Sequence, residues 1–227
     1  MDTSNKVELI GWYGGDRAIA RAAWTSTQID VDKKSDEQVR DLLVNKLWNN
    51  ESGKPHRTPF ERGIVEFNIT CDVASHIHLI KHRHANVNGE SARYKELKED
   101  KYYLPKDWTD AKISDSFESL NTASDDWYER LKEYTEEGNR LYHECLKDLT
   151  PILGRKRAKE SARFFKTYNS QITLSVMMNM SCFHNFYTLR VDDAAQLEIK
   201  EIAEQMLMCV KNIPNDPFKY TLEAFGF

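Results

Sequence analysis

The densest group of polar side chains in the sequence lies between residues 81 and 94, which read KHRHANVNGESARY. It combines three firm cations (Lys81, Arg83 and Arg93) with two histidines, two amides, one acid and one glycine. A planar guanidinium beside a hydroxyl, as in Arg93 and Ser91, is well suited to binding a phosphate. The segment therefore favours an anion-binding site, and the structural alternative is a solvated basic loop.

Three further segments hold polar groups that could belong to a site. Residues 56–61 read HRTPFE and offer a histidine, a threonine and an acid around a turn. Arg163 lies between apolar residues of an expected helix, where it either snorkels to solvent or meets a buried anion. Residues 179–190, NMSCFHNFYTLR, set two amides and Arg190 among aromatic side chains. Taken singly, each has an ordinary structural explanation, which for Arg190 is an ion pair with the acids at 192–193.

A metal site is the rival interpretation of the histidine-rich stretch that contains His76, His78, His82 and His84. His78 and His82 stand four residues apart, a spacing that can chelate a metal on a helix. No glutamate lies between them in an HExxH pattern, and Lys81 and Arg83 would repel a dication. The sequence therefore favours an anion over a metal at this place.

The composition is that of an ordinary globular protein: 227 residues, 40% apolar, 30% charged and a formal charge of −4. The net negative charge argues against a protein that coats nucleic acid, although the basic run 155–157 could hold a small phosphate ligand. The four cysteines form no CxxC pair, so neither a zinc site nor a disulfide framework is expected. We find no signal peptide and no apolar stretch of membrane-spanning length, so we expect a cytoplasmic protein.

Hydrophobic periodicity predicts the elements that must position these residues. We expect strands over residues 7–13, 64–70 and 171–178, and helices over 17–24, 35–48, 72–83, 113–148, 158–165, 179–189 and 194–212. Asp16 should cap the first helix, residues 124–126 could interrupt the long one, and Ile80 should be partly buried. Residues 84–92 should form a loop. The pattern indicates one α+β domain over residues 1–227.

Together the polar segments resemble the flavin-dependent thymidylate synthases. The signature of that family is Arg-His-Arg, seven residues, then Ser, usually continuing to Arg-Tyr, and here it runs from Lys81 to Tyr94. The family's His-x-Thr/Ser-Pro-Phe-Glu stretch is matched at 56–61. Its Asn-Phe-x-x-Leu-Arg and Ala-Gln-x-Glu-Ile-Arg runs are matched at 185–190 and 195–200, the latter ending in lysine. Motif order and separations agree over most of the chain.

The resemblance implies a small, mostly antiparallel sheet flanked by long helices, and an enzyme. That enzyme would transfer a one-carbon unit from methylenetetrahydrofolate to C5 of dUMP, giving dTMP, with FAD reduced by NADPH. It would be a homotetramer with active sites shared between subunits, without nucleic-acid or membrane partners. The implied FAD contacts are Thr58, Lys81, His82, Arg83, Asn179 and Asn185. The implied dUMP contacts are His78, Lys81, Glu90, Ser91, Arg93, Arg163 and Arg190, with Arg190 stabilising charge on the uracil ring.

The chain departs from the family pattern at four places. Lys81 replaces the usual first arginine, which keeps the charge and loses the planar fork. The acid before Ser91 is displaced by one residue, and Gly89 loosens the loop. Ser181 stands where many members carry a basic residue, and Arg62 stands where histidine is usual. These changes leave two alternatives open: a dUMP or dCMP hydroxymethylase on the same fold, and a flavin- or nucleotide-binding protein without catalysis.

Overall fold

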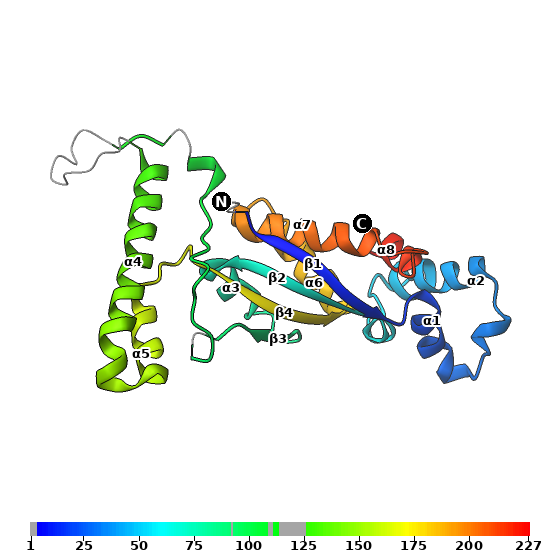
Figure 1. The fold of residues 1–227 in the computed structure, drawn as a ribbon. Helices are drawn as coiled ribbons and strands as arrows, with labels where there is room; N and C mark the ends of the chain where they lie inside the picture. The colour runs from blue at the N-terminus through cyan, green and yellow to red at the C-terminus, as the bar shows by residue number, and fades with distance from the viewer. Residues whose placement is uncertain (1–3, 92, 109–110, 114–125) are drawn as a thin grey trace. The chain divides into compact units, whose positions relative to one another are not determined.

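A computed structural model describes residues 4–91, 93–108, 111–113 and 126–227 (Figure 1). Within this part of the chain, four strands form one antiparallel sheet in the order β1-β2-β4-β3. The strands are β1 (Lys6–Tyr13), β2 (Ile64–Asp72), β3 (Asn86–Gly89) and β4 (Gln171–Asn179). The α-helices are α1 (Asp16–Trp24), α2 (Asp36–Asp41), α3 (Val73–Leu79), α4 (Trp127–Leu153), α5 (Arg155–Ala162), α6 (Met180–Arg190), α7 (Leu197–Lys211) and α8 (Lys219–Phe225). The predicted α+β class with a small antiparallel sheet is confirmed.

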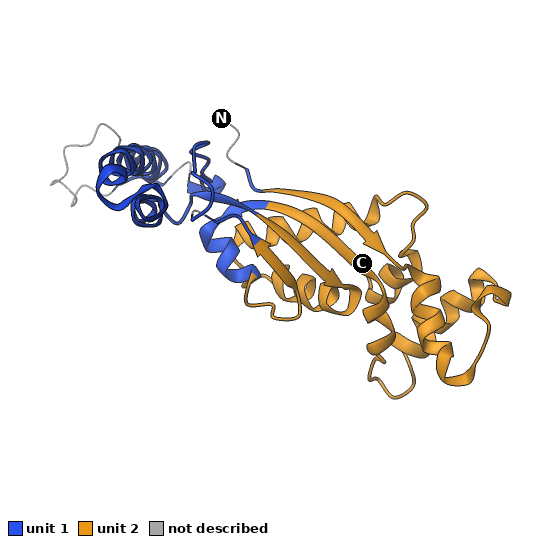
Figure 2. Cartoon of the chain, turned by 60° about the horizontal axis from the view of Figure 1, so that its bottom comes forward, with its two compact units in different colours: residues 1–5, 70–79, 89–173 blue, residues 6–69, 80–88, 174–227 orange. Residues whose placement is uncertain are grey.

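The chain divides into two compact units, which Figure 2 colours separately. Unit 1 comprises Met1–Asn5, Thr70–Leu79 and Gly89–Thr173, and carries α3, α4 and α5. Unit 2 comprises Lys6–Ile69, Ile80–Asn88 and Leu174–Phe227, and carries the other five α-helices. The single domain over residues 1–227 stays a prediction.

The core of unit 2 follows from alternation along its strands. In β2, Val65, Phe67 and Ile69 are fully buried, as the period of two predicts. Helix α7 presents Ile202 and Met206, both fully buried, and its Gln205 side chain accepts a hydrogen bond from the backbone N–H of Val7 (3.2 Å). Figure 1 shows α6 and α7 together on one face of the sheet. Helix α6, which carries the last of the polar motifs, is thereby held against a rigid support.

The second helix begins where its capping residues predict. Ser35 and Gln38 form a reciprocal capping box at the start of α2. The helix then continues as a π-helix over Leu42–Trp48. The backbone N–H of His56 donates to the carbonyl of Leu47 at 2.8 Å, which ties the following loop to this helix. Trp48 and the 56–61 stretch are thus brought together.

Several expected boundaries were wrong. Residues 86–89 of the expected loop pair as β3, an edge strand too short and too polar to show periodicity. Helix α3 ends at Leu79, and Ile80 is 44% exposed rather than partly buried. The long helix begins at Trp127, where Asp126 accepts a hydrogen bond from the N–H of Glu129. The predicted helical residues 114–125 lie outside the described part of the chain.

Helices α4 and α5 of unit 1 pack as a hairpin around a small apolar cluster. Tyr142, Leu146, Ala158 and Ala162 are its buried members. Beside it, the ammonium of Lys166 lies 2.6 Å from an Asp100 carboxylate oxygen and 4.6 Å from the centre of the Tyr142 ring. The Lys166 ammonium also donates to Asn139 of α4 (2.7 Å), and Asp100 contacts His143 of α4 (2.9 Å), so this partly buried ion pair links the segment around Asp100 to α4.

Candidate active site

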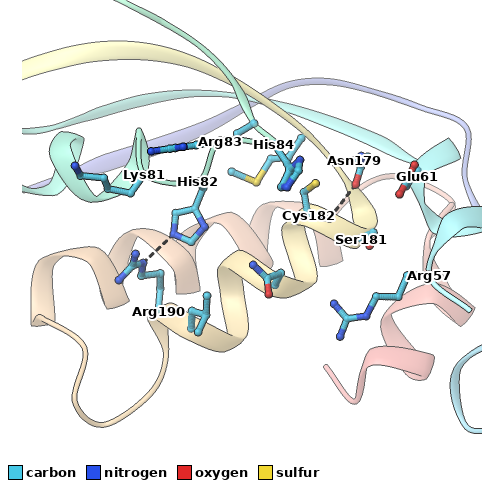
Figure 3. A pocket seen from close by; sticks show the side chains of 14 residues that line it. Arg57, Glu61, Lys81, His82, Arg83, His84, Asn179, Ser181, Cys182 and Arg190 are labelled. Carbon is cyan, nitrogen blue, oxygen red and sulfur yellow. Dashed lines mark hydrogen bonds between the residues drawn. The ribbon is translucent and has the colours of Figure 1, made fainter. Parts of the chain in front are cut away.

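Unit 2 contains an open cavity of about 740 Å³, shown in Figure 3. Its volume lies in the range of about 300–1,000 Å³ that is usual for small-molecule and cofactor sites. The lining residues come from the 56–61 stretch, the 81–85 segment, the end of β4 and helix α6: Arg57, Glu61, Lys81, His82, Arg83, His84, Ala85, Met178, Asn179, Ser181, Cys182, Asn185, Leu189 and Arg190. Three of the four sequence motifs therefore meet at one cavity.

A hydrogen bond joins two of these motifs across 108 residues of sequence: Arg190 Nε donates to His82 Nε2 at 3.0 Å. Because an arginine Nε can only donate, Nε2 of His82 is the acceptor of this hydrogen bond. The His82 ring also packs edge-on against Phe186 (4.9 Å between centroids). Phe186 and Arg190 are four residues apart and share one face of α6. Helix α6 therefore fixes His82 in place.

The first turn of α6 forms another wall of the cavity. Asn179 caps the helix, since its Oδ1 accepts a hydrogen bond from the N–H of Cys182 (2.8 Å). The N–H of Met180 donates to the carbonyl of Gly63 at 2.9 Å, which anchors this helix end to the start of β2. A capped helix N-terminus adds a partial positive charge to the wall. Among the described residues no group accepts a hydrogen bond from the amide nitrogen of Asn179, which can therefore donate to a ligand.

The cavity is strongly positive. Within the described residues, none of Arg57, Lys81, Arg83 and Arg190 forms an ion pair with a carboxylate. Glu61 is the acidic residue among the lining side chains. Side chains of opposite charge normally pair when they are brought together, so four cations around one cavity indicate an anionic ligand.

The cavity brings together most of the predicted FAD contacts and few of the predicted dUMP contacts. Of the former, Lys81, His82, Arg83, Asn179 and Asn185 line it. Thr58 does not line it, although Arg57, just before the 3-10 helix Thr58–Arg62, and Glu61, within that helix, do. Of the latter, Lys81 and Arg190 line it, whereas His78, Glu90, Ser91, Arg93 and Arg163 belong to unit 1. All of these contacts stay predictions.

Three of the predicted dUMP contacts of unit 1, Glu90, Ser91 and Arg93, have side-chain partners within that unit. Arg93 Nε lies 2.7 Å from a carboxylate oxygen of Glu160. Glu90 accepts from the ammonium of Lys95 (2.5 Å) and from the backbone N–H of Thr173 (3.2 Å). The displaced acid of the signature therefore links Lys95 of its own loop to the backbone of β4. Ser91 Oγ accepts from the N–H of Arg93 at 3.3 Å.

Eight lining residues were not among the predicted contacts: the apolar Ala85, Met178 and Leu189, and five others, Arg57, Glu61, His84, Ser181 and Cys182. Each is adjacent to, or inside, a motif that was recognised, so proximity in sequence was the available signal. Burial and the charge of Glu61 raise the pKa of the Cys182 thiol, which keeps it protonated. A thiolate nucleophile is therefore not what this wall offers.

An aromatic cluster supports the far side of α6. The ring of His184 packs against Trp48 (4.6 Å), Phe225 (4.8 Å) and Phe227 (5.5 Å, stacked). Its Nδ1 is buried and has no hydrogen-bond partner among the described residues. Burial, with a smaller contribution from the charge of Arg57, lowers the pKa of His184 to about 4.

This shift predicts acid sensitivity. The unfolded chain binds a proton at His184 near pH 6.5, whereas the folded chain resists it until about pH 4, so stability is lost as the pH falls through this window. As the pH is lowered from 7.5 to 4.5, the free energy of unfolding of His184→Phe should rise by about 1 kcal/mol relative to that of wild type. This value is smaller than the full pKa shift implies, because the His184 side chain is partly exposed. Melting temperatures across that range test this. The exposed His56→Gln is the control, and an equal gain there would contradict the assignment.

The comparisons with known proteins bear on the whole chain. The sequence profile of the family described as "Thymidylate synthase complementing protein" matches residues 8–215. A flavin-dependent thymidylate synthase from Rickettsia bellii is 30% identical over 241 aligned positions that cover 96% of this chain and 74% of that protein. The chain belongs to this family. The predicted resemblance to the flavin-dependent thymidylate synthases is confirmed, and so is the prediction that the chain is an enzyme.

Other proteins of the same description are also similar to this chain over most of its length. The flavin-dependent thymidylate synthase of Gluconobacter oxydans is 28% identical, and the chain spans 66% of its length. That of Thermosipho africanus is 26% identical with 90% spanned. Among solved structures, the UMP/dUMP methylase PolB from Streptomyces cacaoi, bound with 5-Br dUMP, superposes with a TM-score of 0.74 at 25% identity, covering 99% of this chain and 96% of that one.

Proposed function

We propose that this protein transfers a one-carbon unit from methylenetetrahydrofolate to C5 of dUMP, giving dTMP, with FAD as the redox cofactor and NADPH as the reductant. The observation that carries the proposal is the cavity of unit 2, in which Arg190 is hydrogen-bonded to His82 beside Lys81 and Arg83, two cations that pair with no carboxylate among the described residues. This combines the two family motifs that bear the chemistry in one positively charged site.

The lining residues fit FAD, because a dinucleotide brings a pyrophosphate and hydrogen-bonding ring edges. Lys81, Arg83 and the N-terminal turn of α6 would bind the pyrophosphate, and the amides of Asn179 and Asn185 would hold polar edges. Bound flavin supplies the reduction step that no side chain of the chain can supply. Catalysis by cysteine is not needed, which agrees with the protonated Cys182.

Arg190 would act on the pyrimidine. Uracil is a poor nucleophile at C5, and negative charge builds on its N3/O4 side when the ring reacts. A guanidinium held in place by His82 stabilises that charge without reorganising, since it is always ionised. The family resemblance assigns the phosphate of dUMP to Arg93 and Arg163, and for this Arg93 would have to leave or share Glu160.

A ribonucleotide is the second candidate substrate. The structural neighbour from Streptomyces cacaoi is described as a methylase of both UMP and dUMP. The departures around Ser91 lie in the motif that the resemblance assigns to the pyrimidine nucleotide. We therefore include UMP and dCMP beside dUMP when substrates are compared.

The test is a product assay with purified protein. After addition of FAD and removal of the excess, the protein should be yellow and show a flavin absorbance band. Incubation with methylenetetrahydrofolate, NADPH and dUMP should then yield dTMP by mass spectrometry, and native mass spectrometry should give a homotetramer. Absence of dTMP among the products would contradict the proposal. A hydroxymethylated product would identify the hydroxymethylase alternative, and flavin binding without any product the non-catalytic one.

None of the described helices is long and apolar enough to cross a membrane. A cytoplasmic location and active sites shared between subunits are carried over from the family resemblance as further parts of this proposal.

A further inference from the structure

Arg57 is a cavity-lining cation to which no family motif assigns a role. It fills the variable position of the His-x-Thr/Ser-Pro-Phe-Glu stretch. Figure 3 shows it on one side of the pocket with Glu61, while Lys81 and Arg190 lie on the other. A ligand that occupies the cavity therefore meets positive charge at both sides.

The ring of Trp48 supports the Arg57 side chain. Its guanidinium lies over the ring of Trp48, 5.4 Å from the centroid. Trp48 is itself fixed, since its ring packs edge-on against the buried Phe60 (5.4 Å) and against Phe225 (4.6 Å). A guanidinium stacked on an indole keeps its planar donors free at the edge and loses less rotamer freedom when it binds.

The charge of Arg57 is not neutralised within the described residues, where it forms no ion pair. The opposite wall at this side of the cavity is the first turn of α6. There Ser181 is uncharged, at the position where the family resemblance leads one to expect a basic residue. Without Arg57, this part of the cavity would present a helix N-terminus and no cationic side chain.

We propose that Arg57 is a cofactor-binding residue that donates hydrogen bonds to a phosphate oxygen of FAD beside the first turn of α6, in place of a basic residue at position 181. Trp48 is its positioning residue and acts through it. The inference rests on the proposed flavin site, and it adds a contact that the sequence motifs do not contain.

The test measures FAD affinity rather than turnover. FAD is titrated into apoprotein while flavin fluorescence is followed, for wild type, Arg57→Ala, Arg57→Lys and Arg62→Ala. Arg62 is the matched control, because it is an exposed arginine at the end of the 3-10 helix that Arg57 precedes, and it does not line the cavity. We expect R57A to bind about tenfold more weakly, R57K to be intermediate and R62A to match wild type. The salt dependence of Kd should be shallower in R57A.

Two further variants separate a direct contact from a structural one. Ser181→Arg introduced into R57A should restore FAD affinity, because it returns a cation to the same wall. Trp48→Phe should weaken FAD binding when Arg57 is present and have no effect in R57A. An R57A protein that binds FAD as tightly as wild type, or a loss that S181R leaves unchanged, overturns the proposal. Wild-type protein that fails to bind FAD overturns the proposed function itself.

Discussion

Replacing Arg190 by alanine is expected to lower kcat for dTMP formation about 10²–10³-fold, the usual cost of removing one preorganised donor from a site of developing negative charge. The guanidinium is fixed by its hydrogen bond to His82 at 3.0 Å, and both residues line the cavity. The stability of the protein should change little, since Arg190 lies in the last turn of α6 and is not part of the core. Steady-state rates and melting temperatures measured on the same preparations check both expectations.

Two companion variants define what Arg190 does. Arg190→Lys keeps the charge and loses the planar fork, so it should recover only part of the rate. His82→Gln keeps an acceptor for the Arg190 Nε–H and should cost less than His82→Ala, which leaves Arg190 unanchored. If R190A retained wild-type kcat, the catalytic assignment would be wrong. If it lost FAD binding instead of kcat, Arg190 would be a cofactor residue.

Local sequence pattern predicted several of the elements that position the cavity, whereas the contacts assigned to FAD and dUMP stay predictions. The alternating residues of β2 and the periodicity after residue 179 are short-range signals, and the helix expected over 179–189 begins within one residue of α6. The motifs then correctly indicated that segments far apart in sequence belong together, as the bond between His82 and Arg190 shows.

What the sequence did not predict depends on long-range contacts. Strand β3 has four residues, and its pairing with β4 defines it rather than its composition. Arg57 becomes notable only when Trp48, from a preceding helix, lies beneath it. Helix α8 was not predicted, because it is seven residues long and the N–H groups of its first turn donate to a residue near the other end of the chain.

That residue is Asp16, and the prediction that it caps α1 was wrong. Its carboxylate accepts hydrogen bonds from the N–H of Tyr220 (2.7 Å) and from the N–H and hydroxyl of Thr221 (2.9 and 2.6 Å). These are N–H groups of the first turn of α8, so Asp16 caps a helix 204 residues away. Its own backbone N–H donates to the carbonyl of Pro217 at 2.7 Å. The first and last helices of unit 2 are thus joined through one buried side chain, which is 7% exposed.

Asp16→Ala is therefore expected to destabilise the protein by about 2–4 kcal/mol, because two buried N–H groups and a hydroxyl lose their acceptor. For a chain of this size the melting temperature should fall by about 5–10 °C. The exposed Asp32, which pairs with Arg21 at the surface, is the matched control, and Asp32→Ala should change stability by less than about 0.5 kcal/mol.

The pH dependence of that difference tests the mechanism. Burial raises the pKa of Asp16 to about 6, above the 3.8 of the unfolded chain, so the folded state binds the extra proton between these values. The stabilisation due to Asp16 should accordingly be largest near pH 4 and decline as the pH rises through 6. The gap between wild type and D16A in urea titrations should be wider at pH 4.5 than at pH 7.5. A gap that widened with rising pH instead would mean that the hydrogen bonds from α8 outweigh burial, and that Asp16 is held ionised.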